Sequence, residues 1–254
     1  MPFITLRDHP EFQIYFEVHG TGEPLLLVHP LMGNLRTWFD LGYVRSLAEF
    51  QLILVDALGH GQSSKPHNPE MYSLEIAAGY LAQILEFLEI SKAKFFGYSM
   101  GALFGFGLAY HYPDYVESLV LGGNYPLKRP PSHKDERLSI FEQGTEAVLE
   151  WQAPQSSRRR EYLKKQDYKA LAAFLRAVNH YDIPEGELRK MYHPILLFAG
   201  SLDPMLPEIQ KTADLLPNSR LIVLAGLDHN QAFLRKSKII DSILEFLRTS
   251  KIDN

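Results

Sequence analysis

Six short apolar runs, each five to seven residues long, recur along the chain and are separated by polar or helical stretches. Runs of this length are typical of strands that are buried on both faces of a parallel sheet. A chain of 254 residues with 46% hydrophobic residues can bury one sizeable core, so we expect one sheet in one unit. The runs lie at residues 25–29, 51–56, 94–98, 118–122, 194–200 and 220–225.

Helical patterns separate most of these runs. Residues 74–88 place leucine, isoleucine and alanine at helical spacing, with acidic and amide side chains on the opposite face. A last helix is expected over about 232–248, and the β-forming runs 3–6 and 12–18 predict an N-terminal hairpin. Strands that alternate with helices favour an α/β fold with a mostly parallel, doubly wound sheet.

The stretch 125–193 breaks this alternation, because it has no strand pattern and its prolines divide it into helical segments. We therefore expect an inserted helical cap at 125–193 and a core formed by 1–124 and 194–254. This stretch carries the run Arg158-Arg159-Arg160. Charge runs of this length usually form a solvated helix face, which is the interpretation we favour here.

Composition excludes several classes of function. The formal net charge of −4 offers no broad basic surface for nucleic acid, so a small-molecule substrate is expected. The absence of cysteine excludes a disulfide framework and a thiolate nucleophile. The apolar runs are too short for the ~20 residues of a membrane-spanning helix. The N-terminus lacks the pattern of a signal peptide, so we expect a cytoplasmic protein.

The segment Gly97-Tyr98-Ser99-Met100-Gly101-Ala102 follows one expected strand and leads into an expected helix. A serine at such a sharp turn is held in a strained conformation, and small residues two positions before and after it allow the neighbouring backbone to approach. The helix N-terminus also leaves the Met100 N–H unpaired and able to stabilise a developing oxyanion. Ser99 is thus predicted as a nucleophile, with the structural turn serine as the alternative.

A second loop carries the family resemblance. The segment Leu27-Val28-His29-Pro30-Leu31 resembles the His-Gly loop of the α/β-hydrolases, in which the following backbone N–H is the second oxyanion donor. The resemblance implies that Leu31 is this donor. Proline replaces glycine at position 30, but the N–H that it removes is not the one that the family uses. The segment 56–63, DALGHGQS, is similar to the family turn D-x-R-G-x-G-x-S, with Leu58 in place of arginine.

The predicted nucleophile needs a neutral histidine as its base, and ten histidines compete for this role. The family order of serine, then acid, then histidine favours His229, which lies between the last expected strand and the last helix. The orienting acid should follow the strand after the cap, where Asp203 lies. Asp228 is the rival acid, although adjacent residues rarely turn their side chains toward each other.

These residues predict a serine hydrolase that cleaves a carboxylic ester or lactone through an acyl-enzyme. Serine in place of aspartate at position 99 argues against epoxide hydrolases and haloalkane dehalogenases of the same fold. Two alternatives stay open. One is a carbon–carbon bond hydrolase, or a lyase of the menaquinone-pathway type, that uses the same residues. The other is a non-catalytic ligand receptor that keeps the fold.

The substrate pocket is expected between the cap and the carboxyl ends of the strands. No sequence pattern for a metal site, a P-loop or a dinucleotide fingerprint is present, so no cofactor is expected. Candidate residues for the apolar wall of the pocket are Trp38, Tyr98, Met100, Tyr125 and Trp151.

Overall fold

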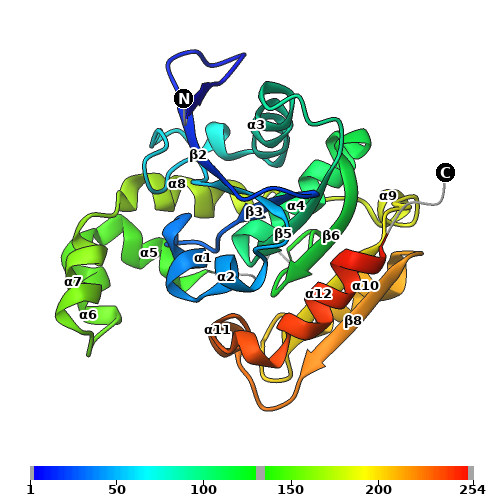
Figure 1. Cartoon of the computed structure of the whole chain (residues 1–254). Helices are drawn as coiled ribbons and strands as arrows, with labels where there is room; N and C mark the ends of the chain where they lie inside the picture. Colours follow the sequence, from blue (N-terminus) through cyan, green and yellow to red (C-terminus); the bar gives the residue numbers. More distant parts are fainter. Residues whose placement is uncertain (1–2, 130–134, 251–254) are drawn as a thin grey trace.

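The computed structural model describes residues 3–129 and 135–250, and these residues form a mostly parallel eight-stranded sheet with helices on both faces (Figure 1). The strand order is β1-β2-β4-β3-β5-β6-β7-β8, in which β2 pairs antiparallel with both β1 and β4 and the other neighbouring strands pair parallel. The strands are β1 (Phe3–Thr5), β2 (Gln13–His19), β3 (Pro24–Val28), β4 (Gln51–Val55), β5 (Ala93–Tyr98), β6 (Val116–Gly122), β7 (Ile195–Gly200) and β8 (Ser219–Leu224). The expected hairpin and doubly wound sheet are therefore confirmed.

Successive side chains of the central strands point to opposite faces of the sheet, which explains the two layers of helices. Leu26 and Val28 of β3 pack in one apolar cluster with α3 (Leu74–Phe87) and α4 (Met100–His111). Leu25 and Leu27 pack in a second cluster with α12 (Ile240–Thr249) and with aromatic residues that precede β4. Because both faces are covered, every residue of β5 and β7 is buried.

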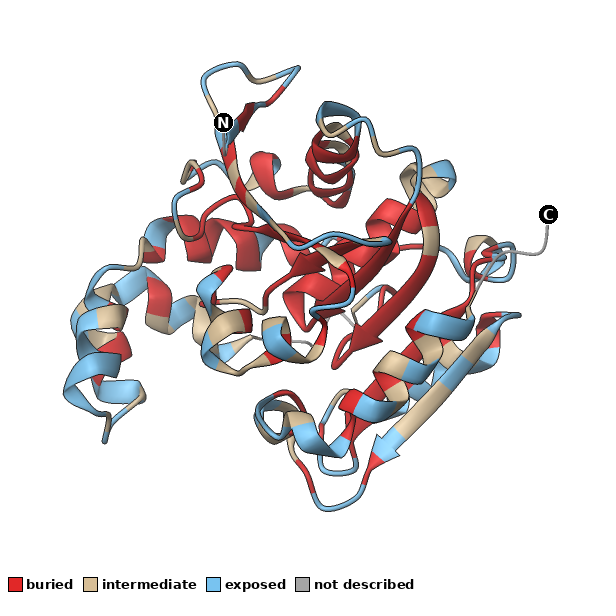
Figure 2. Ribbon diagram, in the orientation of Figure 1, coloured by how far each residue is buried: buried red, intermediate tan, exposed pale blue. Residues whose placement is uncertain are grey.

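The helical segment 125–193 lies between β6 and β7 in the chain. It contains α5 (Glu136–Gln143), α6 (Thr145–Trp151), α7 (Ser157–Lys164), α8 (Tyr168–Val178) and α9 (Glu185–Leu188). In Figure 1, α6 and α7 project from one end of the molecule, whereas α8 runs back toward the sheet. Figure 2 shows the same contrast in burial, with α8 mostly buried and α7 mostly exposed.

The C-terminal helix corrects the sequence prediction. Instead of one helix over about 232–248, the chain forms α11 (His229–Leu234), a 3-10 turn η3 (Lys236–Lys238) and α12. The break lies at Ile239, whose φ of −136° and ψ of −21° are not helical. Apolar residues at helical spacing continue across this break because both helices pack on the same face of the sheet.

Shorter elements complete the fold: α1 (Arg36–Asp40), α2 (Tyr43–Ser46), η1 (Pro69–Tyr72), η2 (Pro113–Tyr115) and α10 (Leu206–Leu215). Within residues 3–129 and 135–250, no helix has the length and apolar character needed to span a bilayer.

Candidate active site

Ser99 occupies the sharp turn between β5 and α4, with φ of 53° and ψ of −109°. This backbone conformation is strained for a residue with a side chain. The turn is possible because the chain passes very close to itself. A Cβ on Gly97 would lie 2.3 Å from the Gly101 oxygen, and a Cβ on Gly101 would lie 2.0 Å from the Val28 oxygen. The glycines at these positions are therefore required by backbone packing.

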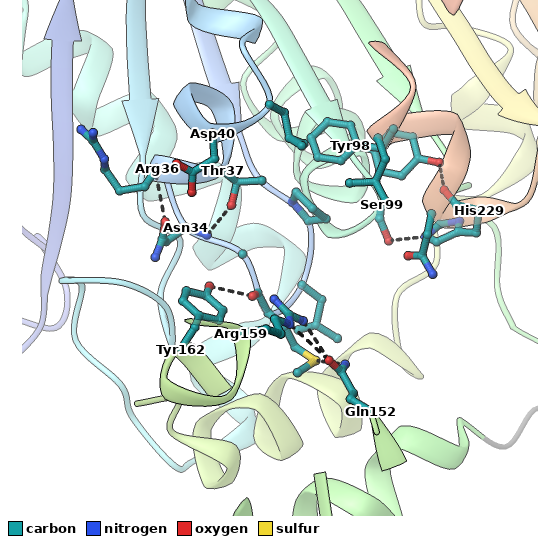
Figure 3. A pocket seen from close by; sticks show the side chains of 18 of the residues that line it. Asn34, Arg36, Thr37, Asp40, Tyr98, Ser99, Gln152, Arg159, Tyr162 and His229 are labelled. Atoms are coloured by element: carbon teal, nitrogen blue, oxygen red, sulfur yellow. Dashed lines mark hydrogen bonds between the residues drawn. The ribbon is translucent and has the colours of Figure 1, made fainter. Parts of the chain in front are cut away.

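Three side chains from separate loops form one chain of hydrogen bonds. His229 Nε2 lies 3.1 Å from Ser99 Oγ, and His229 Nδ1 lies 2.7 Å from Asp203 Oδ2. Figure 3 shows the Ser99 and His229 side chains turned toward each other at the cavity wall. Because the Asp203 carboxylate can only accept, the ring proton lies on Nδ1, and Nε2 is left to accept the Ser99 hydroxyl proton.

The ends of the parallel strands bring these residues together. Asp203 follows β7, His229 follows β8, and Ser99 follows β5, all at the carboxyl edge of the sheet. Asp203 is 3% exposed, and its second oxygen accepts a hydrogen bond of 3.0 Å from the Met205 N–H. Both oxygens of this buried carboxylate are thus occupied, which fixes its orientation.

Asp228 has a different role in the structure. Its side chain accepts a 2.8 Å hydrogen bond from the Gln231 N–H and caps the start of α11, while the Gln231 side chain accepts from the Asp228 N–H. This capping box fixes the residue before the histidine. Asp203, rather than Asp228, is the carboxylate that contacts His229.

Tyr98 is a further contact of the histidine that sequence reasoning did not find. Its hydroxyl donates to the His229 carbonyl oxygen at 2.5 Å, and its ring stacks on Phe233 with centroids 4.6 Å apart. Burial raises the pKa of Tyr98, so the hydroxyl keeps its proton and its role as donor. The two residues are 131 positions apart in the chain, and no local pattern signals such a contact.

The 29–33 loop is held by two fully buried histidines. His29 Nε2 accepts from the Ala57 N–H at 3.1 Å, and its Nδ1 lies 2.8 Å from the Pro30 oxygen. His60 Nε2 accepts from the Met32 N–H at 3.4 Å, which supports Met32 at a positive φ of 60°. Burial lowers the pKa of both histidines, so they stay neutral and act as acceptors.

The backbone donors proposed from the sequence lie in these two turns. Within the described residues, neither the Leu31 nor the Met100 N–H donates to another backbone or side-chain group. Asp56 fixes the loop behind them, because its carboxylate accepts from the Leu35 and Gln62 N–H groups at 2.7 Å each. Hydrogen bonds from the segment 56–63 thus fix the 29–33 loop in place.

A cavity of about 1080 Å³ opens beside Ser99 and His229. Of the five residues predicted for the pocket wall, Tyr98 and Trp151 line this cavity and Trp38 does not. Trp38 is fully buried and packs edge-on against Tyr43, Phe96 and Phe233, so the prediction fails because this ring belongs to the core. Among the described residues, Tyr125 and Met100 are also outside the lining; Tyr125 lies beneath the Arg129 guanidinium.

The rest of the lining comes from the 29–33 loop, α1, α5, the end of α6, α7 and α11. It includes Pro30, Leu31, Met32, Gly33, Asn34, Arg36, Thr37, Asp40, Leu41, Arg137, Gln152, Ser156, Arg158, Arg159, Tyr162, Asn230, Phe233 and Leu234. All three arginines of the run 158–160 are exposed, as predicted, and two of them line the cavity. No group of three or more histidine or acidic side chains arranged to hold a metal ion is found in residues 3–129 and 135–250.

Similarity to known proteins supports this architecture. The family model described as alpha/beta hydrolase fold matches residues 23–143. The "Putative carbamate hydrolase RutD" of Stutzerimonas stutzeri (strain A1501) is 30% identical over 241 residues, which cover 83% of this chain and 88% of that protein. The chain belongs to the α/β-hydrolase fold family. It is therefore an α/β-hydrolase enzyme, as the sequence resemblance implied.

Two further relatives span nearly all of this α/β-hydrolase. The "Putative 2-succinyl-6-hydroxy-2,4-cyclohexadiene-1-carboxylate synthase" of Bacillus subtilis (strain 168) is 27% identical over 250 residues, covering 89% of this chain and 90% of that protein. The crystal structure of a hydrolase from Pseudomonas aeruginosa PA01 superimposes with a TM-score of 0.82 at 26% identity, covering 96% of this chain and 97% of that one.

Proposed function

We propose that this α/β-hydrolase is a serine hydrolase that cleaves a carboxylic ester or lactone of a small molecule through an acyl-enzyme on Ser99. The observation that carries the proposal is the hydrogen-bonded series Ser99–His229–Asp203, placed at a strained turn beside a cavity. Such a series activates a hydroxyl, because the histidine takes its proton as the oxygen attacks.

The reaction then has two halves. Ser99 Oγ attacks the ester carbonyl carbon and His229 Nε2 receives the hydroxyl proton, while Asp203 stabilises the resulting imidazolium. His229 gives this proton to the leaving alkoxide as the carbon–oxygen bond breaks. Water then adds to the acyl-enzyme with His229 as base, the acid is released, and Ser99 regains its proton.

The Leu31 and Met100 N–H groups would stabilise the oxyanion of each tetrahedral intermediate. Both are free of other partners in the described chain, and Met100 starts α4, so its N–H points out of the helix end. Donors of this kind contribute about 3 kcal/mol of transition-state stabilisation each. We assign residues 125–193 as a cap over a core of 1–124 and 194–254, since α6 and α7 supply part of the cavity lining.

A second candidate function is cleavage or elimination at a carbon–carbon bond with the same three residues. It is supported by the relative from Bacillus subtilis, whose name describes a cyclohexadiene carboxylate synthase. In this candidate the Ser99 oxygen, activated by His229, would attack a ketone carbonyl or remove a proton. A ligand receptor of the same fold is the remaining alternative.

A fluorophosphonate probe tests the proposal directly. The folded protein should gain one adduct by intact mass, mapped to Ser99, and heat-denatured protein should gain none. Ser99→Ala should abolish labelling and lower ester turnover by about 10⁴-fold or more. Ser118→Ala is the matched control, because the buried Ser118 hydroxyl has no partner in the described structure and should be dispensable.

The outcomes separate the candidates. Turnover of simple esters or lactones with a trapped acyl-enzyme supports the proposal. Labelling at Ser99 without ester turnover, combined with cleavage of dienoate ketones, favours carbon–carbon chemistry. Labelling with no turnover of either class favours a receptor, and full ester activity in Ser99→Ala contradicts the proposal.

A further inference from the structure

The cavity wall carries more positive than negative charge. Four arginines line it, at positions 36, 137, 158 and 159, against one acid, Asp40. The chain as a whole has a formal net charge of −4, so this concentration does not follow from the overall composition. A local excess of one charge in a cleft attracts ligands of the opposite sign.

Two of the four arginines are paired within the protein. Arg137 binds Asp135 through two nitrogens, with Nε 2.8 Å from Oδ1. Arg158 lies 3.4 Å from Asp40, and both side chains are mostly exposed. Arg36 stacks over the Phe39 ring, with its guanidinium carbon 4.2 Å from the ring centre. Carboxylates thus offset the charges of Arg137 and Arg158, and the Phe39 ring covers one face of Arg36.

Arg159 has a different environment. Its Nη2 and Nε lie 3.0 and 3.3 Å from the Gln152 side-chain oxygen, and its guanidinium lies over the Tyr162 ring at 5.3 Å. Within residues 3–129 and 135–250, no carboxylate lies within 4 Å of it. A neutral amide and an aromatic face orient the guanidinium while leaving its charge uncompensated.

The residues that hold Arg159 also contact the 29–33 loop. The Tyr162 hydroxyl donates to the Met32 oxygen at 2.7 Å, and the Gln152 amide lies 3.9 Å from the Met32 sulfur. Figure 3 shows Arg159, Gln152 and Tyr162 gathered on one part of the cavity wall, with Ser99 and His229 on another. The cation is therefore fixed relative to the loop that carries the Leu31 N–H.

We propose that the substrate carries a carboxylate remote from its scissile bond and that Arg159 binds this carboxylate. This inference rests on the proposed ester or lactone hydrolysis and specifies its substrate class: the monoester of a dicarboxylic acid, or a lactone with a carboxylate substituent. One uncompensated guanidinium matches the single charge and planar fork of a carboxylate. A phosphate dianion would need a second free cation beside it.

The part of the proposed substrate between its carboxylate and its scissile bond is apolar. Trp151 and Leu234 line the same cavity and are 44% and 57% exposed, so the free enzyme presents apolar surface within the cavity that holds the arginine. A chain of methylene groups would cover this surface, whereas a polar spacer would leave it without a partner.

Matched ester pairs test the proposal in the full-length enzyme. Monoethyl succinate, glutarate, adipate and suberate are compared by pH-stat with the ethyl keto-esters in which a methyl ketone replaces the carboxylate. At the best chain length, wild type should prefer the anionic ester by about tenfold in kcat/KM. Arg159→Gln should reduce this ratio to near one, and Arg159→Lys should restore part of it.

Arg160→Gln is the control, because Arg160 is the next residue in the same charge run and lies outside the cavity lining. It should keep the wild-type ratio, and high salt should lower that ratio in both proteins. The proposal is overturned if wild type shows no preference at any chain length, or if Arg159→Gln and Arg160→Gln give the same ratio. Stronger competitive inhibition by inorganic phosphate than by glutarate also contradicts it.

A binding measurement separates this proposal from the hydrolytic one. Calorimetric titration of Ser99→Ala with the same monoethyl esters needs no turnover, and adding Arg159→Gln should weaken binding about tenfold. If Ser99 proves unreactive but this loss is seen, the carboxylate site stands and the proposed hydrolysis fails. If esters are hydrolysed but Arg159→Gln binds as tightly as its parent, only the carboxylate site fails.

Discussion

Asp203 follows β7 and Asp228 directly precedes His229, and their carboxylates accept from different donors. Asp203 accepts from the His229 ring and the Met205 N–H, whereas Asp228 accepts from the Gln231 N–H at the start of α11. The first arrangement fixes the tautomer of His229, the proposed base. The second provides an acceptor for an N–H at the start of α11 that no helical carbonyl can pair, and so stabilises the helix.

Substitution by asparagine should therefore separate these two acids. Asp203→Asn keeps the shape but supplies an amide that can donate to the ring, so we expect kcat for an ester substrate to fall about 10³–10⁴-fold. Asp228→Asn keeps an acceptor for the helix cap and should stay within about twofold of wild type. Steady-state kinetics on both purified variants measures this, and the opposite ranking would refute the assignment of Asp203.

His29 and His60 make the stability of the protein pH-dependent. Burial lowers the pKa of both in the folded state, and the neighbouring His29 lowers that of His60 further. Below the unfolded value of ~6.5 the unfolded chain binds protons that the folded chain excludes. Their contribution to stability is therefore complete above pH ~6.5 and is lost as pH falls below it.

Urea unfolding between pH 7.5 and 5 should show this loss. Each histidine that stays neutral adds a slope of about 1.4 kcal/mol per pH unit over the range in which only the unfolded state is protonated. His60→Gln removes one of these groups while keeping an amide near Met32, so its unfolding free energy should fall less steeply with acid. Parallel slopes for wild type and variant would show that His60 does not set the acid sensitivity.

At the scale of elements, α7 is connected to the 29–33 loop by one hydrogen bond, from the Tyr162 hydroxyl to the Met32 oxygen. Met32 has a positive φ and directly follows Leu31, whose N–H is the proposed oxyanion donor. A positioning role for Tyr162 would affect the transition state more than substrate binding, because an oxyanion donor acts mainly after the carbonyl has been attacked.

Tyr162→Phe tests this role. The ring beneath Arg159 is kept and only the hydroxyl is lost, so we expect kcat to fall about three- to tenfold with little change in KM, and stability to fall by about 1 kcal/mol. Tyr168→Phe is the matched control, since the Tyr168 hydroxyl donates to the Leu163 oxygen at 2.7 Å within the same helical segment. Equal kcat values for the two variants would assign Tyr162 a purely structural role.

Local patterns predicted the elements well, because strand burial and turn sterics are encoded within a few residues. The Ser99 turn is an example, since Gly97 and Gly101 are required by contacts that any such turn makes. The break at Ile239 was missed because apolar spacing continues across it. The Tyr98 contact with His229 and the burial of Trp38 depend on residues far away in the chain. Periodic patterns of apolar residues do not predict such long-range contacts.

At the scale of the whole molecule, the helical segment 125–193 does not pack as a separate unit. Residues of α5 and α8 belong to the same apolar cluster as α3, α4 and one face of the sheet. The Tyr181 hydroxyl also donates to the Tyr72 oxygen beneath α8. The strands would all survive removal of residues 125–191, but the surface that α8 covers would be exposed to water.

Substitution by alanine should therefore have different effects on stability at two aromatic residues of this segment. Phe174 of α8 is 3% exposed and lies edge-on to Phe104 and Tyr72, with ring centres 6.1 and 6.3 Å apart. Phe174→Ala should lower the free energy of unfolding by about 3–5 kcal/mol, through lost burial and a residual cavity. Trp151 of α6 is 44% exposed, so Trp151→Ala should cost less than about 1 kcal/mol.

Urea unfolding monitored by circular dichroism measures both variants. A single transition in wild type, with the same dependence of the unfolding free energy on urea concentration in the variants, would show that the helical segment and the sheet unfold together. Under that condition the full cost of Phe174→Ala appears in the global transition, because the ring packs on the α4 and η1 residues of the core. A separate early transition, with the main transition unaffected by Phe174→Ala, would instead show that the helical segment folds independently of the sheet.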